Sequence, residues 1–526
     1  MKNFARLMAL VLALVCCLST MIACKTIEVY SEEETGYETK EEDGKLWAKD
    51  EWGVWREMDA LDEAELDYGG KEIKVLCGNS STKIEFQQTE ETNEARPAAV
   101  YKRNKAIQNR LGVELSFATQ AASASTIQTF TSTVKTAKDN GTALCDIIAV
   151  YSRIQGSLLL NGCLTDLMAI EDSHLDLSKP WWPANLVGNL RIQDSLYYVS
   201  GDISVSAIDE MHCLYFNKEL VNDEFTSEAV NAGFENGTEW LYNLVYNKEW
   251  TIDKMVELSS GKWVDNGTDG ATVDDKYGIC SVNYCMAAVY GGCNLRMIQQ
   301  DVNKTLIVSP DFTSQRTTRI VSLLGSLMFS NSYHDVARNG QSEGYQKPFV
   351  DGNSIFILQY MRLAEDNLIG NDAVEEYGML PLPKYEASQK NYYTVLGNSF
   401  TIFSIFNGCD DRGDRAATES MLSAVLECWA SEGFRKTTPV VFEMNMQLKY
   451  SPTQDETNMC EYIRAGIVFD MGRIFDTILS KGEGTINMDL EVAEAARNKT
   501  SWSAAYSKNY DRMQSNLEDF VTGLNG

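Results

Sequence analysis

Cys145-Asp146-Ile147-Ile148-Ala149-Val150-Tyr151 is the stretch of this 526-residue chain that decides its fold. A short, uninterrupted apolar run after an acidic residue predicts a strand that is buried on both faces, as in a parallel sheet. Alternating strand and helix patterns lead up to it. In chain order they are a strand over 72–77, a helix over 98–111, a strand over 113–117, and a helix carrying Ile127, Phe130 and Val134. This alternation is typical of a doubly wound parallel α/β sheet.

Ligands of such sheets bind beyond the carboxyl ends of the strands. Asn79 and Glu85 follow the first predicted strand, and Tyr151 stands at the end of the third. These three residues are therefore candidates for ligand contact.

The N-terminus predicts export and lipid anchoring. Lys2 and Arg6 precede an apolar run over 7–18 that is too short to span a bilayer but fits a signal peptide. Met21-Ile22-Ala23-Cys24 resembles the lipobox of bacterial lipoproteins. The resemblance implies cleavage after residue 23 and a diacylglycerol on Cys24. An ordinary secretory signal and a retained membrane anchor are the alternatives.

Residues 24–68 are expected to form a lipid-anchored acidic tether. Between residues 31 and 66 there are 14 Asp or Glu and 4 Lys or Arg, with few branched aliphatic residues. A segment of this composition buries too little apolar surface to offset its ordering entropy, so we expect it to be largely disordered. Trp47, Trp52 and Trp55 do not fit a pure linker, and their role stays open.

Charge and cysteine content exclude several function classes. The net charge of −29 becomes about −31 once Lys2 and Arg6 are removed with the signal, which argues against nucleic acid and anionic membrane partners. Ten of the 13 cysteines lie after residue 24 without any CxxC pair, and they are expected to be buried thiols. Three histidines give metal or triad chemistry little material, and no cofactor motif is present.

Further short motifs follow the deciding stretch in an ordered series. They are Asn161-Gly162-Cys163-Leu164-Thr165-Asp166-Leu167, Leu196–Asp202, Leu214-Tyr215-Phe216-Asn217-Lys218-Glu219-Leu220, Glu249–Asp253, Phe349–Phe356 and Tyr377–Lys384. Together, over residues 70 to about 405, the series resembles the extracellular solute-binding proteins of sugar-uptake ABC transporters, of the family 1 type. The length of the body and the segment 223–246 depart from that family's usual pattern.

The resemblance implies an α/β, two-lobe, periplasmic-binding-protein-like fold of type II, with a hinge and a ligand cleft between the lobes. The expected division is lobe one over 69–205, lobe two over 206–345, a return to lobe one over 346–398, and a helical part over 399–526, mostly in lobe two. It also implies a non-enzymatic protein that captures a carbohydrate, most simply an oligosaccharide, and delivers it to ABC permease subunits. Its place would be the outer face of the cytoplasmic membrane, in a bacterium without an outer membrane.

A sugar site needs flat aromatic faces together with carboxylates or amides in the plane of the ring. Core packing or a solvated charge is the alternative for each candidate residue. The aromatic candidates are Tyr151, Trp181, Trp182, Tyr284 and Tyr360, and the polar candidates are Asn79, Glu85, Asp202, Asp209 and Glu210. Glu210 is singled out by the resemblance, because the family frequently keeps an acidic residue about eight positions before the lysine that matches Lys218.

Two other function classes remain open at this point. A glycan-active enzyme needs two suitably spaced carboxyl groups, which 75 acidic residues cannot exclude. A surface glycan-binding lipoprotein without a transport role would keep the anchor and the aromatic residues but would not need a hinge.

Overall fold

The computed structural model describes residues 29–30, 38–50, 53–62, 65–78, 83–88, 90, 92–267, 270–335, 344–408, 413–445, 453–480, 488–507 and 509–525. The chain divides into two compact units, Met1–Glu65 and Leu66–Gly526. Among the described residues, no helix is both long enough and apolar enough to cross a membrane. Cys24 and the predicted signal lie outside the described residues.

The first unit contains a four-stranded antiparallel sheet in the order β1-β2-β3-β4. Its strands are β1 (Val29–Tyr30), β2 (Thr39–Glu42), β3 (Lys45–Lys49) and β4 (Trp55–Met58). Ala48 and Met58 are buried in it, with Leu46 packed against them. The expectation of a largely disordered tether is therefore wrong for these strands, since cross-strand pairing and a small apolar face order them despite their acidic composition.

The first sheet of the second unit has the order β16-β7-β5-β6. Strands β5, β6 and β7 are parallel, and β16 runs antiparallel to β7. The bounds are β5 (Lys71–Gly78), β6 (Val113–Gln120), β7 (Ile147–Tyr151) and β16 (Thr401–Ile405). The three strands predicted from the apolar runs are thus confirmed.

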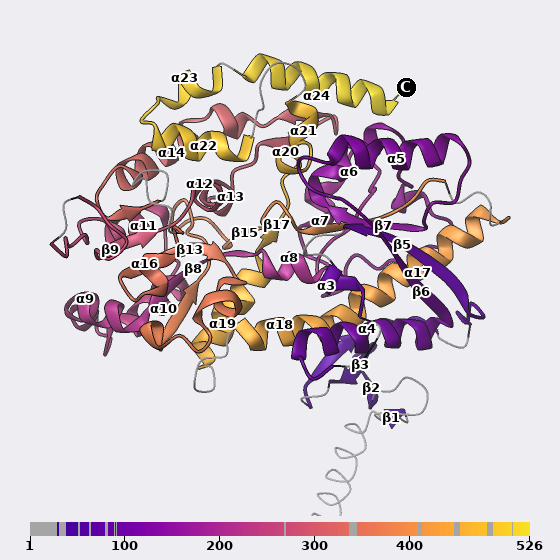
Figure 1. The fold of residues 1–526 in the computed structure, drawn as a ribbon, viewed down its shortest axis with the longest axis horizontal. Coiled ribbons are helices and arrows are strands. Elements are labelled where there is room, and N and C mark those ends of the chain that lie inside the picture. The colour runs from indigo at the N-terminus through magenta and orange to yellow at the C-terminus, as the bar shows by residue number, and fades with distance from the viewer. Residues whose placement is uncertain are drawn as a thin grey trace, which may run out of the picture. The chain divides into compact units, whose positions relative to one another are not determined.

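Helices cover both faces of this first sheet (Figure 1). The two helices predicted between its strands are confirmed as α4 (Ala95–Leu111) and α5 (Ile127–Asp139). Helix α4 ends at Gly112, whose φ of 57° is the left-handed conformation that favours glycine. Helices α5 and α6 (Ser152–Leu160) lie on one face of the sheet, while α4 and α17 (Arg415–Glu432) lie on the other.

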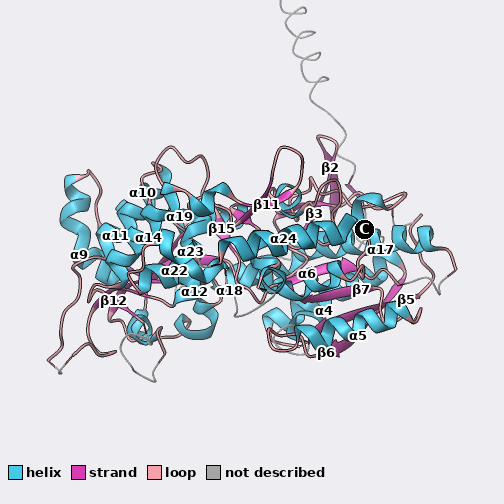
Figure 2. Ribbon diagram, turned by 90° about the horizontal axis from the view of Figure 1, so that it is seen from above, coloured by secondary structure: helices cyan, strands magenta, loops and turns pink. Residues whose placement is uncertain are grey.

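The second sheet has the order β12-β9-β13-β8-β14. Strand β8 runs antiparallel to both of its neighbours, and β9 runs parallel to β12 and β13. The bounds are β8 (His212–Asn217), β9 (Tyr277–Cys280), β12 (Tyr333–His334), β13 (Ser354–Tyr360) and β14 (Tyr377–Leu380). The unit is therefore built from two α/β lobes, one around each sheet, as expected (Figure 2).

The expected return to lobe one over 346–398 is wrong. Strand β13 lies in the middle of the second sheet, between β8 and β9, and β14 forms an edge of the same sheet. All residues of β13 except Tyr360 are buried, so the strand needs a hydrogen-bonded neighbour on each side, and the second sheet supplies both. The chain returns to the first sheet only at β16.

The expectation that 399–526 belongs mostly to lobe two is also wrong, because this part is shared between the lobes. Helix α17 packs on α4 of the first lobe, and α24 (Tyr510–Asn525) contacts α6 of that lobe. Helix α19 (Gln454–Ala465) packs on β14, and α22 (Met488–Arg497) packs on α14 (Gln315–Met328), both in the second lobe. Its helical character is as predicted.

Candidate functional site

The end of the second sheet at which β8 begins and β13 finishes gathers residues from widely separated parts of the chain. We call it the cluster edge. Helix α8 (Val205–Asp209) is capped by Ser204, whose hydroxyl accepts a hydrogen bond from the amide of Ala207 at 3.1 Å. The helix stops directly before β8, so Asp209 and Glu210 reach this edge. Because β8 is antiparallel to β13, His212 at the start of β8 pairs with Tyr360 at the end of β13.

Three tyrosines meet at this edge. The rings of Tyr284 and Tyr360 are stacked, with centroids 5.9 Å apart and an interplanar angle of 26°. Tyr284 also meets Tyr345 edge to face, and their hydroxyl oxygens are 2.9 Å apart. All three side chains are half-buried, so they keep some ring surface that a ligand can contact. We call Glu210, Tyr284, Tyr345 and Tyr360 the tyrosine–carboxylate cluster.

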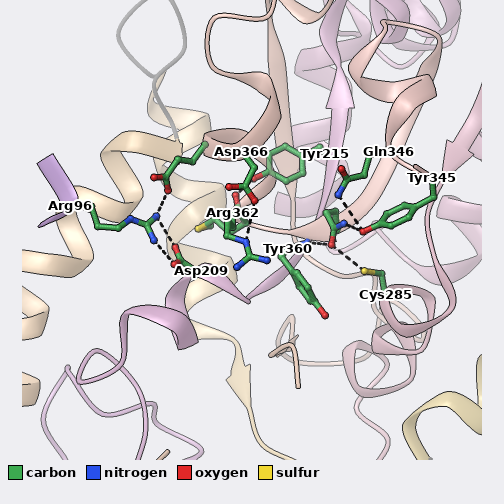
Figure 3. Close-up of polar contacts among 12 residues, drawn as sticks. Arg96, Asp209, Tyr215, Cys285, Tyr345, Gln346, Tyr360, Arg362 and Asp366 are labelled. Atoms are coloured by element: carbon green, nitrogen blue, oxygen red, sulfur yellow. Dashed lines mark hydrogen bonds and ion pairs between the residues drawn. The ribbon is translucent and has the colours of Figure 1, made fainter. Parts of the chain in front are cut away.

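Gln359 on β13 holds the tyrosine rings in place. Gln359 donates from its amide nitrogen to the hydroxyl of Tyr345, and its amide oxygen accepts from the Tyr360 backbone N–H at 2.8 Å. That oxygen also accepts from the Cys285 thiol at 3.2 Å. On the other side, the His212 ring lies 4.7 Å from the Tyr360 ring, and its Nδ1 donates to the carbonyl of Val395 at 2.8 Å. Figure 3 shows Tyr345, Tyr360 and Cys285 around this network.

Glu210 is a buried carboxyl group with spare hydrogen-bonding capacity. It is 2% exposed, and its Oε2 has no hydrogen-bond partner among the described residues. Burial raises its pKa to about 7, partly offset by a hydrogen bond from Ser399. Carboxylate oxygens of this kind accept hydrogen bonds from ligand hydroxyls.

Gly397 fits closely against this carboxylate. A Cβ at this position would collide with Oε2 of Glu210 and lie 2.9 Å from a ring carbon of Tyr360. The backbone N–H of Gly397 donates to the carbonyl of Glu210 at 2.7 Å. Only glycine lets the segment that returns to β16 pass this close to the cluster.

An arginine from the first lobe reaches the same region. Arg96 on α4 binds Asp209 with both terminal nitrogens, at 2.5 and 3.0 Å, and also pairs with Glu365 in η3 (Ala364–Leu368). Asp209 is 6% exposed. The arrangement, which we call the Arg96 clamp, ties α4 to the end of α8 and to the segment after β13 (Figure 3).

The structure brings Asp209, Glu210, Tyr284 and Tyr360 close together, and their role as ligand contacts stays a prediction. Tyr151 is half-buried at the end of β7 and pairs in register with Thr401. Asn79 lies outside the described residues.

Trp181 and Trp182 are not available for stacking, so their prediction as ligand contacts is wrong. They are 0% and 3% exposed, and their indole nitrogens donate to the two carboxylate oxygens of Glu427 at 3.0 and 2.9 Å. Glu427 lies on α17, so the pair anchors that helix.

Glu85 and Asp202 are also buried in internal contacts away from the tyrosine–carboxylate cluster. Glu85 accepts a hydrogen bond from Thr401 at 3.1 Å and lies beside Arg103. Asp202 pairs with Arg464 and accepts from the hydroxyl of Thr438 at 2.6 Å. Both join elements distant in sequence, which gives each a structural role. Oε1 of Glu85 has no hydrogen-bond partner among the described residues, so its prediction as a ligand contact stays untested.

Sequence reasoning missed Tyr345, Gln359, Gly397 and Arg96. Gln359 precedes Tyr360 in a strand, so the alternation of side chains along a strand does not group the two residues. No sequence pattern links Arg96 to Asp209, 113 positions later. The Gly397 contact follows from tertiary packing alone.

A second hollow, of about 510 Å³, lies between α7 (Leu186–Leu190) and the hairpin of β10 (Ile298–Gln300) and β11 (Leu306–Val308). Arg191, Arg296 and Gln299 are among the residues that line it. The Gln300 side chain donates to the carbonyl of Arg191 across it. It offers polar groups but only one aromatic ring, that of Phe469.

No protein-family model matches the chain, and no curated protein does. Among solved structures, it is similar to the sugar-binding protein MalE from Xanthomonas citri, with 13% identity, a TM-score of 0.49, and coverage of 85% of this chain and 98% of that one. A family 1 extracellular solute-binding protein from Bifidobacterium longum subsp. infantis matches with 12% identity, a TM-score of 0.48, and coverage of 86% and 100%. An ABC substrate-binding protein from Listeria monocytogenes in complex with cycloalternan matches with 12% identity, a TM-score of 0.47, and coverage of 85% and 99%.

Proposed function

We propose that this chain is a solute-binding protein that captures a carbohydrate, most simply an oligosaccharide, and delivers it to an ABC importer by hinge closure. The observation that carries the proposal is the tyrosine–carboxylate cluster, which combines stacked aromatic rings with a buried carboxylate that has a free acceptor oxygen. Sugars present C–H faces to rings and hydroxyls to carboxylates, so this combination suits them.

The position of the cluster supports a hinge mechanism. Asp209 and Glu210 belong to the segment that connects the two lobes, and Gly397 belongs to the segment that returns to the first sheet. A ligand that contacts Glu210 and the tyrosines therefore touches one connection, and Gly397 of the other connection packs against Glu210 and Tyr360. Such contacts differ between open and closed arrangements, which is the condition for a ligand to shift the equilibrium toward closure.

In this proposal the N-terminal Cys24 carries a lipid that keeps the protein beside the permease subunits on the outer face of the cytoplasmic membrane. The chain is proposed to act without catalysis.

The test is calorimetric titration of the protein with a panel of neutral oligosaccharides, combined with product analysis of each ligand that binds. We expect binding without turnover. Product formation would replace the proposal with a glycan-active enzyme. Sugar binding by a protein that does not associate with ABC permease subunits would favour a surface glycan binder.

Variants locate the site. We expect Tyr360→Ala and Tyr284→Ala to weaken binding at least 10-fold, whereas Tyr506→Ala on α23 (Trp502–Ser507), a half-buried tyrosine in another part of the lobe, leaves it unchanged. If the cluster variants bind normally and Gln299→Ala does not, the ligand occupies the hollow beside α7 instead.

A further inference from the structure

A pocket of about 300 Å³ shares no residue with the tyrosine–carboxylate cluster or with the hollow beside α7. It lies among the end of α10 (Gly237–Tyr246), the segment that precedes β15 (Thr394–Val395), and the end of α19. Three lysines line it, namely Lys248, Lys384 and Lys390. A group of three lysines is conspicuous in a chain with a net charge of −29.

Lys384 is buried and rigidly placed. The residue is 1% exposed, its backbone N–H donates to the carbonyl of Trp250 at 3.1 Å, and its carbonyl accepts from Ile252 at 2.8 Å. Its ammonium nitrogen lies 4.2 Å from the centre of the Tyr392 ring. These contacts direct the charged end of the side chain to the pocket.

The ammonium of Lys384 has little compensation for the water it has lost. Its one hydrogen-bond acceptor among the described residues is the carbonyl of Lys390, at a long 3.5 Å, and no described carboxylate forms an ion pair with it. Burial, reinforced by the nearby charge of Lys248, lowers its pKa to about 8. A buried cation without a counter-ion is costly, and an anion in the pocket would remove most of that cost.

The nearby acidic groups do not fill this role. Asp455 accepts a hydrogen bond from the hydroxyl of Tyr246 at 2.6 Å, so it is engaged at the rim. Glu249 lies close enough to raise the pKa of Tyr392 but forms no ion pair with Lys384. The pocket therefore keeps an excess of positive charge around Lys384.

The rest of the lining suits a sugar ring. The Tyr462 ring lies 6.3 Å from that of Tyr246 and 6.0 Å from that of Tyr392, and Tyr393 also faces the pocket. Asn185 and Asn391 add amide groups. A volume of about 300 Å³ is at the small end of ligand pockets, which range over roughly 300–1,000 Å³.

We propose that this pocket is a second ligand site, for an anionic monosaccharide whose carboxylate or phosphate pairs with Lys384 while its ring packs against the tyrosines. The site stands independently of the function proposed for the tyrosine–carboxylate cluster, because it consists of different residues and offers lysine ammonium groups instead of a carboxyl group.

Calorimetric titration of the full chain with glucuronate, glucose 6-phosphate and glucose tests the proposal. We expect at least one of the two anions to bind, and glucose to bind at least 10-fold more weakly than that anion. The preferred anion then distinguishes a carboxylate ligand from a phosphate ligand. Equal affinity for glucose, or no binding of either anion, overturns the proposal.

Two variants identify the lysine responsible. Lys384→Met keeps the length of the side chain but removes its charge, and we expect it to weaken anion binding at least 10-fold. The matched control Lys304→Met, at an exposed position outside the pocket lining, should change anion affinity less than 3-fold. Far-UV circular dichroism spectra that match that of the wild type show that both variants are folded.

If Lys384→Met does not fold, Lys248→Glu provides the second measurement, because Lys248 is exposed at the rim. The added carboxylate should weaken anion binding at least 3-fold. Unchanged anion affinity in Lys248→Glu and in any folded Lys384→Met overturns the proposal.

Discussion

At the scale of single residues, Glu210 combines burial, a free acceptor oxygen and a place at the junction between the lobes. Its pKa rises from the ordinary 4.5 to about 7 because burial disfavours the charged form. The folded protein therefore holds this proton more tightly than the unfolded chain does. The stabilisation is fully present below about pH 4.5 and is lost as the pH rises through about 7.

We predict that Glu210→Gln removes this pH dependence. Between pH 4.5 and 7.5 the wild type should lose up to about 3 kcal/mol of unfolding free energy more than the variant does. Urea unfolding of both proteins at the two pH values measures the difference. Parallel stability profiles for the two proteins would show that Glu210 does not titrate in this range.

Trp181 was a candidate for ligand stacking, but in the structure it is a fully buried core residue. We predict that Trp181→Ala lowers the unfolding free energy by about 3–5 kcal/mol, the usual cost of emptying a large buried site. Oligosaccharide affinity of the folded fraction should stay within 2-fold of wild type. Urea unfolding and calorimetric titration test the two statements, and an affinity loss without a stability loss would restore Trp181 to the binding site.

At the scale of elements, the Arg96 clamp connects α4 to the α8–β8 junction. Removing one partner of a buried ion pair leaves an uncompensated charge, which typically costs about 3–5 kcal/mol. We therefore predict that Arg96→Leu destabilises the protein by that amount.

A double-mutant cycle separates this pairing from general packing. We expect Asp209→Asn to recover part of the stability lost in Arg96→Leu, with a coupling energy of about 1–3 kcal/mol between the two positions. Additive losses, measured by urea unfolding, would show that the two side chains do not act together.

The Gly397 segment gives a second prediction at this scale. In Gly397→Ala the new methyl group must displace Glu210 or the Tyr360 ring, which lies 2.9 Å away. We expect oligosaccharide affinity to fall at least 10-fold. Gly188→Ala is the control, because a Cβ there meets nothing within 4 Å. Normal binding by Gly397→Ala would remove this segment from the proposed site.

At the scale of the whole molecule, ligand binding and the free energy of unfolding are linked, because the proposed site exists only in the folded protein. A ligand that binds only the folded form stabilises it by about 2.7 kcal/mol at 100 times its Kd. We predict that a bound oligosaccharide raises the thermal midpoint by several degrees in a concentration-dependent manner. Differential scanning fluorimetry of wild type and Tyr360→Ala tests this, and an equal shift in both would place the ligand elsewhere.

Local sequence patterns were sufficient for the three parallel strands of the first sheet and for α4 and α5, but not for β16. Strands β5 and β7 were recognisable because their apolar runs are short and bounded by breaking residues, and Gly112 marked the end of α4. Glu210 was named as a candidate through its spacing from Lys218, Tyr360 through its place after a predicted strand, and Tyr284 through its place before Gly291-Gly292. In the N-terminal unit, Asp43-Gly44 was an overlooked hairpin signal, since both residues have positive φ and join β2 to β3.

The sequence by itself thus determined the α/β class and the three parallel strands of the first sheet, because these depend on periodicity and short spacings. Only the tertiary structure decided that β13 belongs to the second sheet and that Trp181 and Trp182 bind Glu427, 246 and 245 positions away. The same holds for the contact of Arg96 with Asp209 and of Gly397 with Glu210. Such contacts depend on which distant segment fills a space, and that is settled by packing of the whole chain rather than by any local pattern.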